Sequence, residues 1–227
     1  MASILRLKEV RLDVPDGVGT RTIFDVPHFE LEEGAFMGVR GASGSGKSTF
    51  LKLISGILLP TTGTIEVGHT VINQLTEVER DRWRGRHIGF LFQDFRLFDG
   101  LTALENVLLP FTFHQNTICR ELREDAVAKL SAVGVRPGTR AECLSRGEMQ
   151  RTALVRVLMQ SPKIILADEP TASLDTVRGD QTVEVLQEAA SSLGATLLLV
   201  SHDERVLSHF NQTITLSNGR LFDGEDE

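Results

Sequence analysis

The sequence predicts an α/β fold: a mixed, mainly parallel sheet, an N-terminal antiparallel β part and an inserted helical subdomain. Two observations support the parallel sheet. Apolar runs of strand length alternate with helical stretches, and a glycine-rich segment joins one such strand to a helix. This order is typical of parallel sheets covered by helices. A long central stretch with helical patterning predicts the inserted subdomain.

The composition is that of a folded globular chain. It is 41% hydrophobic and 24% charged, as is usual for globular proteins, and 227 residues are enough for one domain with a sizeable core. The net charge of −7 argues against a nucleic-acid partner, since such proteins usually carry a basic stripe. The longest apolar runs fall far short of the roughly 20 residues that span a bilayer. The N-terminus lacks an apolar signal core with a cleavage site, so we expect a cytoplasmic protein.

The expected elements follow from local patterns. Residues 1–14 alternate apolar and polar side chains as a strand does, and residues 35–40 form a short buried strand. A helical pattern follows the glycine-rich segment, and Gly56 is placed to end it. In chain order, the remaining expectations are a helix from residue 76 to about 86, a strand at 88–92, helices at 102–109, 121–133 and 147–160, a strand at 163–168, a helix at 176–193, a strand at 196–201, and a closing hairpin around 218–219.

Residues 41–48, GASGSGKS, match the P-loop pattern. Glycines in such a loop let successive backbone N–H groups curl around phosphates, at a helix N-terminus whose dipole favours anions. In this arrangement Lys47 reaches the β- and γ-phosphates and Ser48 ligates Mg²⁺. The expected nucleotide-binding residues of this part are Gly41, Ser43, Gly44, Ser45, Gly46, Lys47, Ser48 and Thr49.

A pair of carboxylates, Asp168 and Glu169, ends the apolar run at residues 164–167. The carboxyl end of a parallel strand is the sheet edge at which α/β proteins bind ligands. On the P-loop template Asp168 holds Mg²⁺ through its hydration shell, and Glu169 orients and polarises the attacking water. Taken alone, such a pair is more often a strand that meets solvent, so this interpretation depends on the P-loop.

Residues 144–151, LSRGEMQR, closely resemble the LSGGQ-QR signature of ABC (ATP-binding cassette) ATPases. Four further segments resemble that family in its own order: Gln93 after FLF, the DEPT of residues 168–171, the SLD of residues 173–175, and His202 after an apolar strand. Together the motifs span nearly the whole chain. The sequence around Gln93 is similar to the branch that contains LolD, MacB and FtsE.

The resemblance implies one ABC ATPase domain, with residues 1–92 and 161–227 as the nucleotide-binding core and residues 93–160 as a helical signature subdomain. It implies ATP and Mg²⁺ as cofactors. The implied catalytic residues are Glu169, His202 and Gln93, and the implied metal ligands are Ser48, Gln93 and Asp168.

The resemblance also implies partners. Two cassettes, as a homodimer or pseudo-dimer, pair head to tail so that Ser145 and Gly147 of one contact the γ-phosphate held by the other. Asp175 belongs to the same implied nucleotide-binding set. Transmembrane permease-like subunits of a bacterial-type transporter or envelope mechanotransmission complex would receive the work. We therefore expect peripheral attachment to the inner face of the cell membrane, and no nucleic-acid partner.

Three positions depart from the family pattern. Arg146 replaces the first signature glycine, Glu148 replaces the signature glutamine, and Val14 lies where the family supplies an aromatic ring to stack on adenine. We expect reduced but retained hydrolysis from Arg146, because Ser145 and Gly147 survive. Val14 predicts either loose base selectivity or a stacking contact from another chain.

Three functions stay open on the sequence alone. The motifs favour a transport or force-transducing ATPase, whereas Arg146 leaves room for a low-turnover ATP-binding regulator. A non-transport ABC ATPase of DNA repair or translation is disfavoured, because such proteins need long coiled-coil insertions or two cassettes. The apolar side chains beside Gln93 are also ambiguous: Phe95, Leu97, Phe98 and Leu101 belong either to the core or to a groove for a membrane partner's coupling helix.

Overall fold

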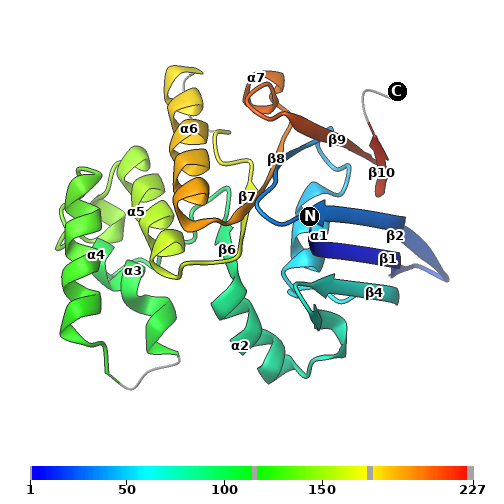
Figure 1. The fold of residues 1–227 in the computed structure, drawn as a ribbon, viewed down its shortest axis with the longest axis horizontal. Helices are drawn as coiled ribbons and strands as arrows, with labels where there is room; N and C mark the ends of the chain where they lie inside the picture. Colours follow the sequence, from blue (N-terminus) through cyan, green and yellow to red (C-terminus); the bar gives the residue numbers. More distant parts are fainter. Residues whose placement is uncertain (1, 114–116, 173–175, 224–227) are drawn as a thin grey trace.

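The computed structural model describes residues 2–113, 117–172 and 176–223. Within these ranges the chain forms two sheets with helices around them, and a group of helices lies to one side (Figure 1). The smaller sheet has the strand order β2-β1-β4-β5, and the larger sheet has the order β10-β9-β3-β8-β7-β6. The predicted α/β class with a mixed sheet is confirmed.

The smaller sheet is the antiparallel part that the N-terminal pattern predicts. Its strands are β1 (Ser3–Asp16), β2 (Gly19–Glu32), β4 (Thr62–Val67) and β5 (Thr70–Val71). β1 pairs antiparallel with both β2 and β4. Alternate side chains such as Leu5 and Leu7 are fully buried, because successive strand residues point to opposite faces.

The larger sheet carries the candidate site. Its strands are β3 (Phe36–Arg40), β6 (Ile88–Leu91), β7 (Ile164–Asp168), β8 (Thr196–Ser201), β9 (Gln212–Ser217) and β10 (Arg220–Asp223). β3, β6, β7, β8 and β9 pair in parallel, and only β10 is antiparallel to its neighbour β9. β7 and β8 are buried along their whole length, as continuous apolar strands of a parallel sheet are. The predicted hairpin turn is confirmed, with positive φ at both Asn218 and Gly219.

The expected helices are present within a few residues of their predicted bounds. The described α-helices are α1 (Lys47–Ile54), α2 (Glu77–His87), α3 (Ala103–Thr112), α4 (Arg120–Ala132), α5 (Arg146–Met159), α6 (Thr176–Leu193) and α7 (Glu204–Leu207), with 3₁₀ turns at Ile72–Gln74 and Ala141–Cys143. α2, α3 and α5 each begin with a capping box, in which a Ser or Thr hydroxyl and a Glu carboxylate satisfy backbone N–H groups.

Three groups of buried apolar side chains hold these layers together. The first lies between the two sheets around α1, where Phe24 and Phe50 stack with ring centroids 5.7 Å apart. The second joins the larger sheet to α5 and α6, and includes Leu154 and Leu186. The third lies inside the lobe of α3, α4 and α5 that Figure 1 shows beside the sheets. The limits of the helical subdomain, residues 93 and 160, stay a prediction.

The described helices include none with the length and apolar character that crossing a membrane requires.

Candidate nucleotide-binding site

The candidate site lies at the carboxyl ends of β3, β7 and β8, around the N-terminus of α1. The P-loop leaves β3 at Arg40 and enters α1 at Lys47. Gly44 and Gly46 have φ of 81° and 108°, which side chains rarely tolerate. At Gly41 a Cβ would lie 2.5 Å from Ser45 Oγ and 2.6 Å from the Leu216 carbonyl oxygen, so glycine is needed for space.

A pocket of about 520 Å³ opens over the P-loop and brings together residues that are far apart in sequence. Gln93 follows β6, Asp168 ends β7, Glu169 comes next, and His202 follows β8. The residues that line the pocket are Ala42, Ser43, Gly44, Gly46, Lys47, Ser48, Thr49, Gln93, Asp168, Glu169 and His202. Gly41 and Ser45 instead line an adjoining hollow of about 410 Å³ on the same loop.

Glu169 is a buried carboxylate at the centre of a hydrogen-bonded group. Its Oε1 lies 3.4 Å from Lys47 Nζ and 2.8 Å from His202 Nδ1, and Ser201 Oγ donates to its Oε2 at 3.3 Å. Lys47 Nζ also donates to the carbonyls of Gly41 (2.7 Å) and Ala42 (3.0 Å). Glu169 has φ of 46°, a left-handed conformation that is uncommon for glutamate and typical of residues held in place for function.

Asp168 provides the second carboxylate of the pocket. Burial raises the pKa of Asp168, a hydrogen bond from Ser48 lowers it, and the neighbouring Glu169 charge raises it again. Ser48, Gln93 and Asp168 thus offer a hydroxyl, an amide and a carboxylate in one pocket. Such hard oxygen donors suit Mg²⁺, which usually binds through one or two carboxylates, substrate phosphates and water. The donor set therefore fits Mg²⁺ that arrives with a nucleotide.

The predicted signature residues lie elsewhere. Ser145 is the N-cap of α5, and its backbone N–H and hydroxyl donate to Glu148 Oε2 at 2.9 and 2.6 Å. These bonds lower the pKa of Glu148, the hydroxyl of Ser145 having the largest effect. Ser145, Arg146 and Gly147 line a separate hollow of about 610 Å³ beside α6. Asp175, with the rest of its predicted motif at 173–175, lies outside the described residues.

The ambiguous apolar segment beside Gln93 is partly buried and partly exposed, and a groove for a coupling helix stays a prediction. Phe95 is 3% exposed and belongs to the core, whereas Phe98 is 57% exposed. Leu97 and Leu101 are half-buried. The apolar residues of this segment follow neither a helical nor a strand period, so the sequence could not predict which of them are buried. Their burial depends on which helices pack over the segment.

Sequence reasoning did not identify Ser201 and Arg156. Ser201 directly precedes His202, so its place at the end of β8 was a usable signal. Arg156 carried no motif signal in the sequence, although it lies in the predicted helix after the signature.

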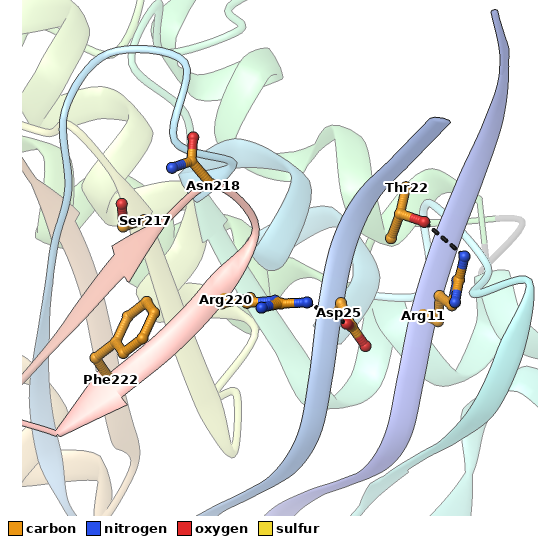
Figure 2. A pocket seen from close by; sticks show the side chains of 7 residues that line it. All are labelled: Arg11, Thr22, Asp25, Ser217, Asn218, Arg220 and Phe222. Carbon is orange, nitrogen blue, oxygen red and sulfur yellow. Dashed lines mark hydrogen bonds and ion pairs between the residues drawn. The ribbon is translucent and has the colours of Figure 1, made fainter. Parts of the chain in front are cut away.

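A further hollow of about 510 Å³ lies between β2 and the β9–β10 hairpin, and Figure 2 shows its lining. Polar groups of its lining pair with one another: Arg220 donates to Asp25 at 3.2 Å, and Arg11 donates to Thr22 at 2.7 Å. Gly219 accepts from the backbone N–H of Asp25 at 2.9 Å and donates to the Ser45 carbonyl at 3.0 Å. Through Gly219, the β9–β10 hairpin therefore connects the P-loop to β2 beside this hollow.

Comparison with known families and proteins agrees with this geometry. The family model described as "ABC transporter" matches residues 24–172. The lipoprotein-releasing system ATP-binding protein LolD 1 of Caulobacter vibrioides is 39% identical over 84% of this chain and 82% of its own length. The macrolide export ATP-binding/permease protein MacB of Burkholderia thailandensis is 36% identical over 96% of this chain, which spans only 33% of that larger protein.

A solved structure is similar over its full length. The dimeric ATP-binding cassette MJ0796, in a post-hydrolysis state bound to ADP and Pi, superposes with a TM-score of 0.87 at 32% identity, covering 98% of this chain and all of that one. The chain belongs to the ABC transporter family. Within it, this chain is an ATP-binding subunit that hydrolyses ATP, and the ATP-binding cassette fold expected from the motifs is confirmed.

Proposed function

We propose that the pocket over the P-loop is the ATPase site of this chain, with Glu169 as the residue that activates the attacking water. The observation that supports this most strongly is the convergence of Lys47, His202 and Ser201 on the Glu169 carboxylate at the mouth of the phosphate loop. Lys47 begins α1 after β3, Glu169 follows β7, and Ser201 and His202 lie at the end of β8, so their convergence depends on the fold and not on one local motif.

The described hydrogen bonds suggest how the site works. Lys47 donates to two P-loop carbonyls and lies beside Glu169. When ATP binds, its phosphate oxygens replace these partners, and the Glu169 carboxylate is released to accept a hydrogen bond from water. The water oxygen attacks the γ-phosphorus, the bond to the bridging oxygen of ADP breaks, and the water proton passes to Glu169 and then to phosphate. His202 and Ser201 keep the carboxylate oriented.

Mg²⁺ belongs to the same proposal. Ser48, Gln93 and Asp168 are the residues that would hold it, because they present oxygen atoms to one pocket. The ion supplies charge that neutralises the β- and γ-phosphate oxygens.

The signature end of α5 supports a dimer. Ser145 and Gly147 lie outside the P-loop pocket and face a different hollow, so they suit the nucleotide of a second cassette. The similar cassette MJ0796 is described as dimeric. We infer a homodimer or pseudo-dimer, in which Ser145 and Gly147 complete the partner's site.

We propose that ATP hydrolysis by this chain drives conformational changes in transmembrane permease-like subunits. MacB, whose name joins an ATP-binding and a permease function, is a relative three times longer than the aligned cassette. Phe98, exposed near Gln93, is a suitable contact for such a partner. The chain would then lie peripherally on the inner face of the membrane.

The test compares ATP turnover of the wild type with that of Glu169→Gln. We expect Glu169→Gln to lower kcat about 10²- to 10⁴-fold, because it removes the proton acceptor but keeps size and hydrogen bonding. Binding of a fluorescent nucleotide should stay unchanged, which serves as the control for folding. A low-turnover regulator would instead show no turnover that depends on Glu169, and that result would reject the ATPase assignment of this site.

A further inference from the structure

The guanidinium of Arg156 is a buried cation that the ATPase mechanism above does not use. Arg156 lies on α5, eleven residues after the signature serine, and is only 8% exposed. Its Nη1 donates to the Arg96 carbonyl at 2.6 Å and its Nη2 to the Phe95 carbonyl at 2.5 Å. Burial lowers the pKa of Arg156 to about 10, so the group stays charged at neutral pH. A buried charge needs such compensation to be tolerated.

The two carbonyls belong to an unusual turn. Phe95 and Arg96 have φ of 59° and 46°, so two consecutive non-glycine residues adopt the left-handed conformation. A left-handed conformation is strained for such residues, because Cβ lies too close to the following carbonyl oxygen. Two charge-assisted hydrogen bonds from one planar guanidinium can offset this strain. Arg156 therefore stabilises a backbone shape that the local sequence does not favour.

The turn lies inside a segment, residues 93–98, that we call the Gln93 segment. At its start Gln93 reaches the P-loop pocket. At its end Phe98 is exposed, and buried Asn106 of α3 accepts from the Phe98 N–H at 2.7 Å and donates to its carbonyl at 3.2 Å. The Gln93 segment is thus held at its middle by α5 and at its end by α3.

α5 also contacts the other side of the site. Buried Gln150 on this helix donates to the carbonyl of Pro170, the residue after Glu169, at 3.2 Å. The signature serine begins the same helix. α5 therefore contacts the loop that follows Glu169 and the Gln93 segment, and its N-terminus forms part of the surface proposed for a second cassette.

We propose that Arg156 is a positioning residue of the ATPase: it fixes Gln93 in the nucleotide pocket relative to the signature helix α5. This inference rests on the proposed role of Gln93 at the ATPase site. A displacement of Phe98 or of α5 would then reach Gln93 through the two bonds of Arg156. Lysine cannot replace this arrangement fully, because an ammonium does not present two parallel N–H donors in a fixed plane.

The test is a double-mutant cycle on the full chain, with Gln93→Ala, Arg156→Gln and the combined variant. Titration with a fluorescent nucleotide gives the concentration of binding-competent sites. Turnover is divided by this concentration, so that unfolded protein does not lower the measured kcat. Arg156→Gln should lower kcat about 10- to 100-fold with little change in KM, as expected for misplacement of a group near the reacting atoms. In the Gln93→Ala background Arg156→Gln should change kcat by less than about twofold, since residues that act through one another are not additive.

Arg120→Gln is the matched control. Arg120 lies on α4, its side chain is 85% exposed, and it pairs with Glu124. Its kcat should stay within about twofold of the wild type. If Arg156→Gln does not fold, Arg156→Lys takes its place in the cycle, with a smaller expected loss in kcat that again disappears in the Gln93→Ala background.

Two results overturn the inference while leaving the ATPase assignment intact. In the first, the losses from Gln93→Ala and from the Arg156 variant multiply, which indicates that Arg156 acts independently of Gln93. In the second, the Arg156 variants turn over at the wild-type rate per site. Failure of the proposed function has a separate signature, because Glu169→Gln would then have no effect on turnover.

Discussion

Two helix N-termini of this protein, those of α1 and α5, are proposed to bind phosphate, yet they are built differently. The N-cap of α1 is Gly46, which has φ of 108° and provides no side-chain cap. The N-cap of α5 is Ser145, whose side chain and backbone form a capping box with Glu148. The first helix leaves its N-terminal dipole facing an open pocket, whereas the second already satisfies its own first turn.

The two helix N-termini differ in how much of a phosphate site the same chain supplies. Around α1 the pocket also holds Lys47, Asp168 and Glu169 from the same chain. Around α5 the capping box resembles those of α2 and α3, for which we propose no ligand. A nucleotide held by a second cassette would have to compete with Glu148 for the Ser145 hydroxyl. We therefore predict that the P-loop of a single chain binds nucleotide, whereas the signature contributes only in a dimer of two cassettes.

We expect the largest change in ATP turnover when two inactive variants, one at each helix N-terminus, are mixed. Lys47→Ala removes the phosphate contact at α1, and Gly147→Asp places a negative charge at α5 that repels phosphate. Each variant alone should lack turnover. Their mixture should regain turnover, to at most about a quarter of the wild-type rate, because half the dimers are mixed and each of these keeps one intact site.

A pull-down between differently tagged chains checks that mixed dimers form in this experiment. Mixed dimers without regained turnover would show that the signature completes its site within one chain, or not at all.

A smaller effect is expected from restoring the family glycine at Arg146. This side chain is exposed beside Ser145, on the surface that we propose for the partner's nucleotide. We expect Arg146→Gly to raise kcat about two- to fivefold, the range typical of one exposed charge. Arg146→Ala controls for the lower helix propensity of glycine. Unchanged turnover and unchanged ATP-dependent dimerisation in both variants would mean that Arg146 is incidental.

The smallest expected effect concerns the titration of Glu148. Its pKa is lowered by the hydroxyl and the backbone N–H of Ser145. The capping box therefore stabilises the fold above the ordinary glutamate pKa of about 4.3, and this contribution is lost as the pH falls through the lowered value. Ser145→Ala should raise the pKa of Glu148, as measured by carboxyl NMR titration.

Glu105 provides the internal control for that titration. Its pKa is lowered in the same way by the backbone N–H and hydroxyl of Thr102. Ser145→Ala should leave the titration of Glu105 unchanged. A Glu148 pKa that does not move would show that the Ser145 hydroxyl is not its main partner in solution.

The sequence predicted much of the fold because most elements are marked locally. Fully apolar runs marked β7 and β8, a Thr–Glu spacing marked the start of α2, and an Asn–Gly pair marked the last hairpin. The P-loop and its glycines were predicted from spacing, since close approach and positive φ restrict the residue type. Such features depend on neighbours within a few positions along the chain.

Other features could not be predicted from local pattern. The separation of Phe95, which is buried, from Phe98, which is exposed, depends on the helices that pack over residues 93–98. The partners of Arg156 lie about sixty positions away and are carbonyl groups, which every residue possesses. No pattern of residue types can mark a partner of that kind.

The α/β class, the order of the elements and the identity of the candidate phosphate-binding and carboxylate residues follow from the sequence alone. The folded chain was needed to show that Lys47, Ser201 and His202 meet at Glu169, and that Ser145 and Gly147 lie apart from them. This is because short-range sterics and burial set the conformation of phosphate loops and strand ends. The meeting of their side chains is set by the parallel register of β3, β7 and β8.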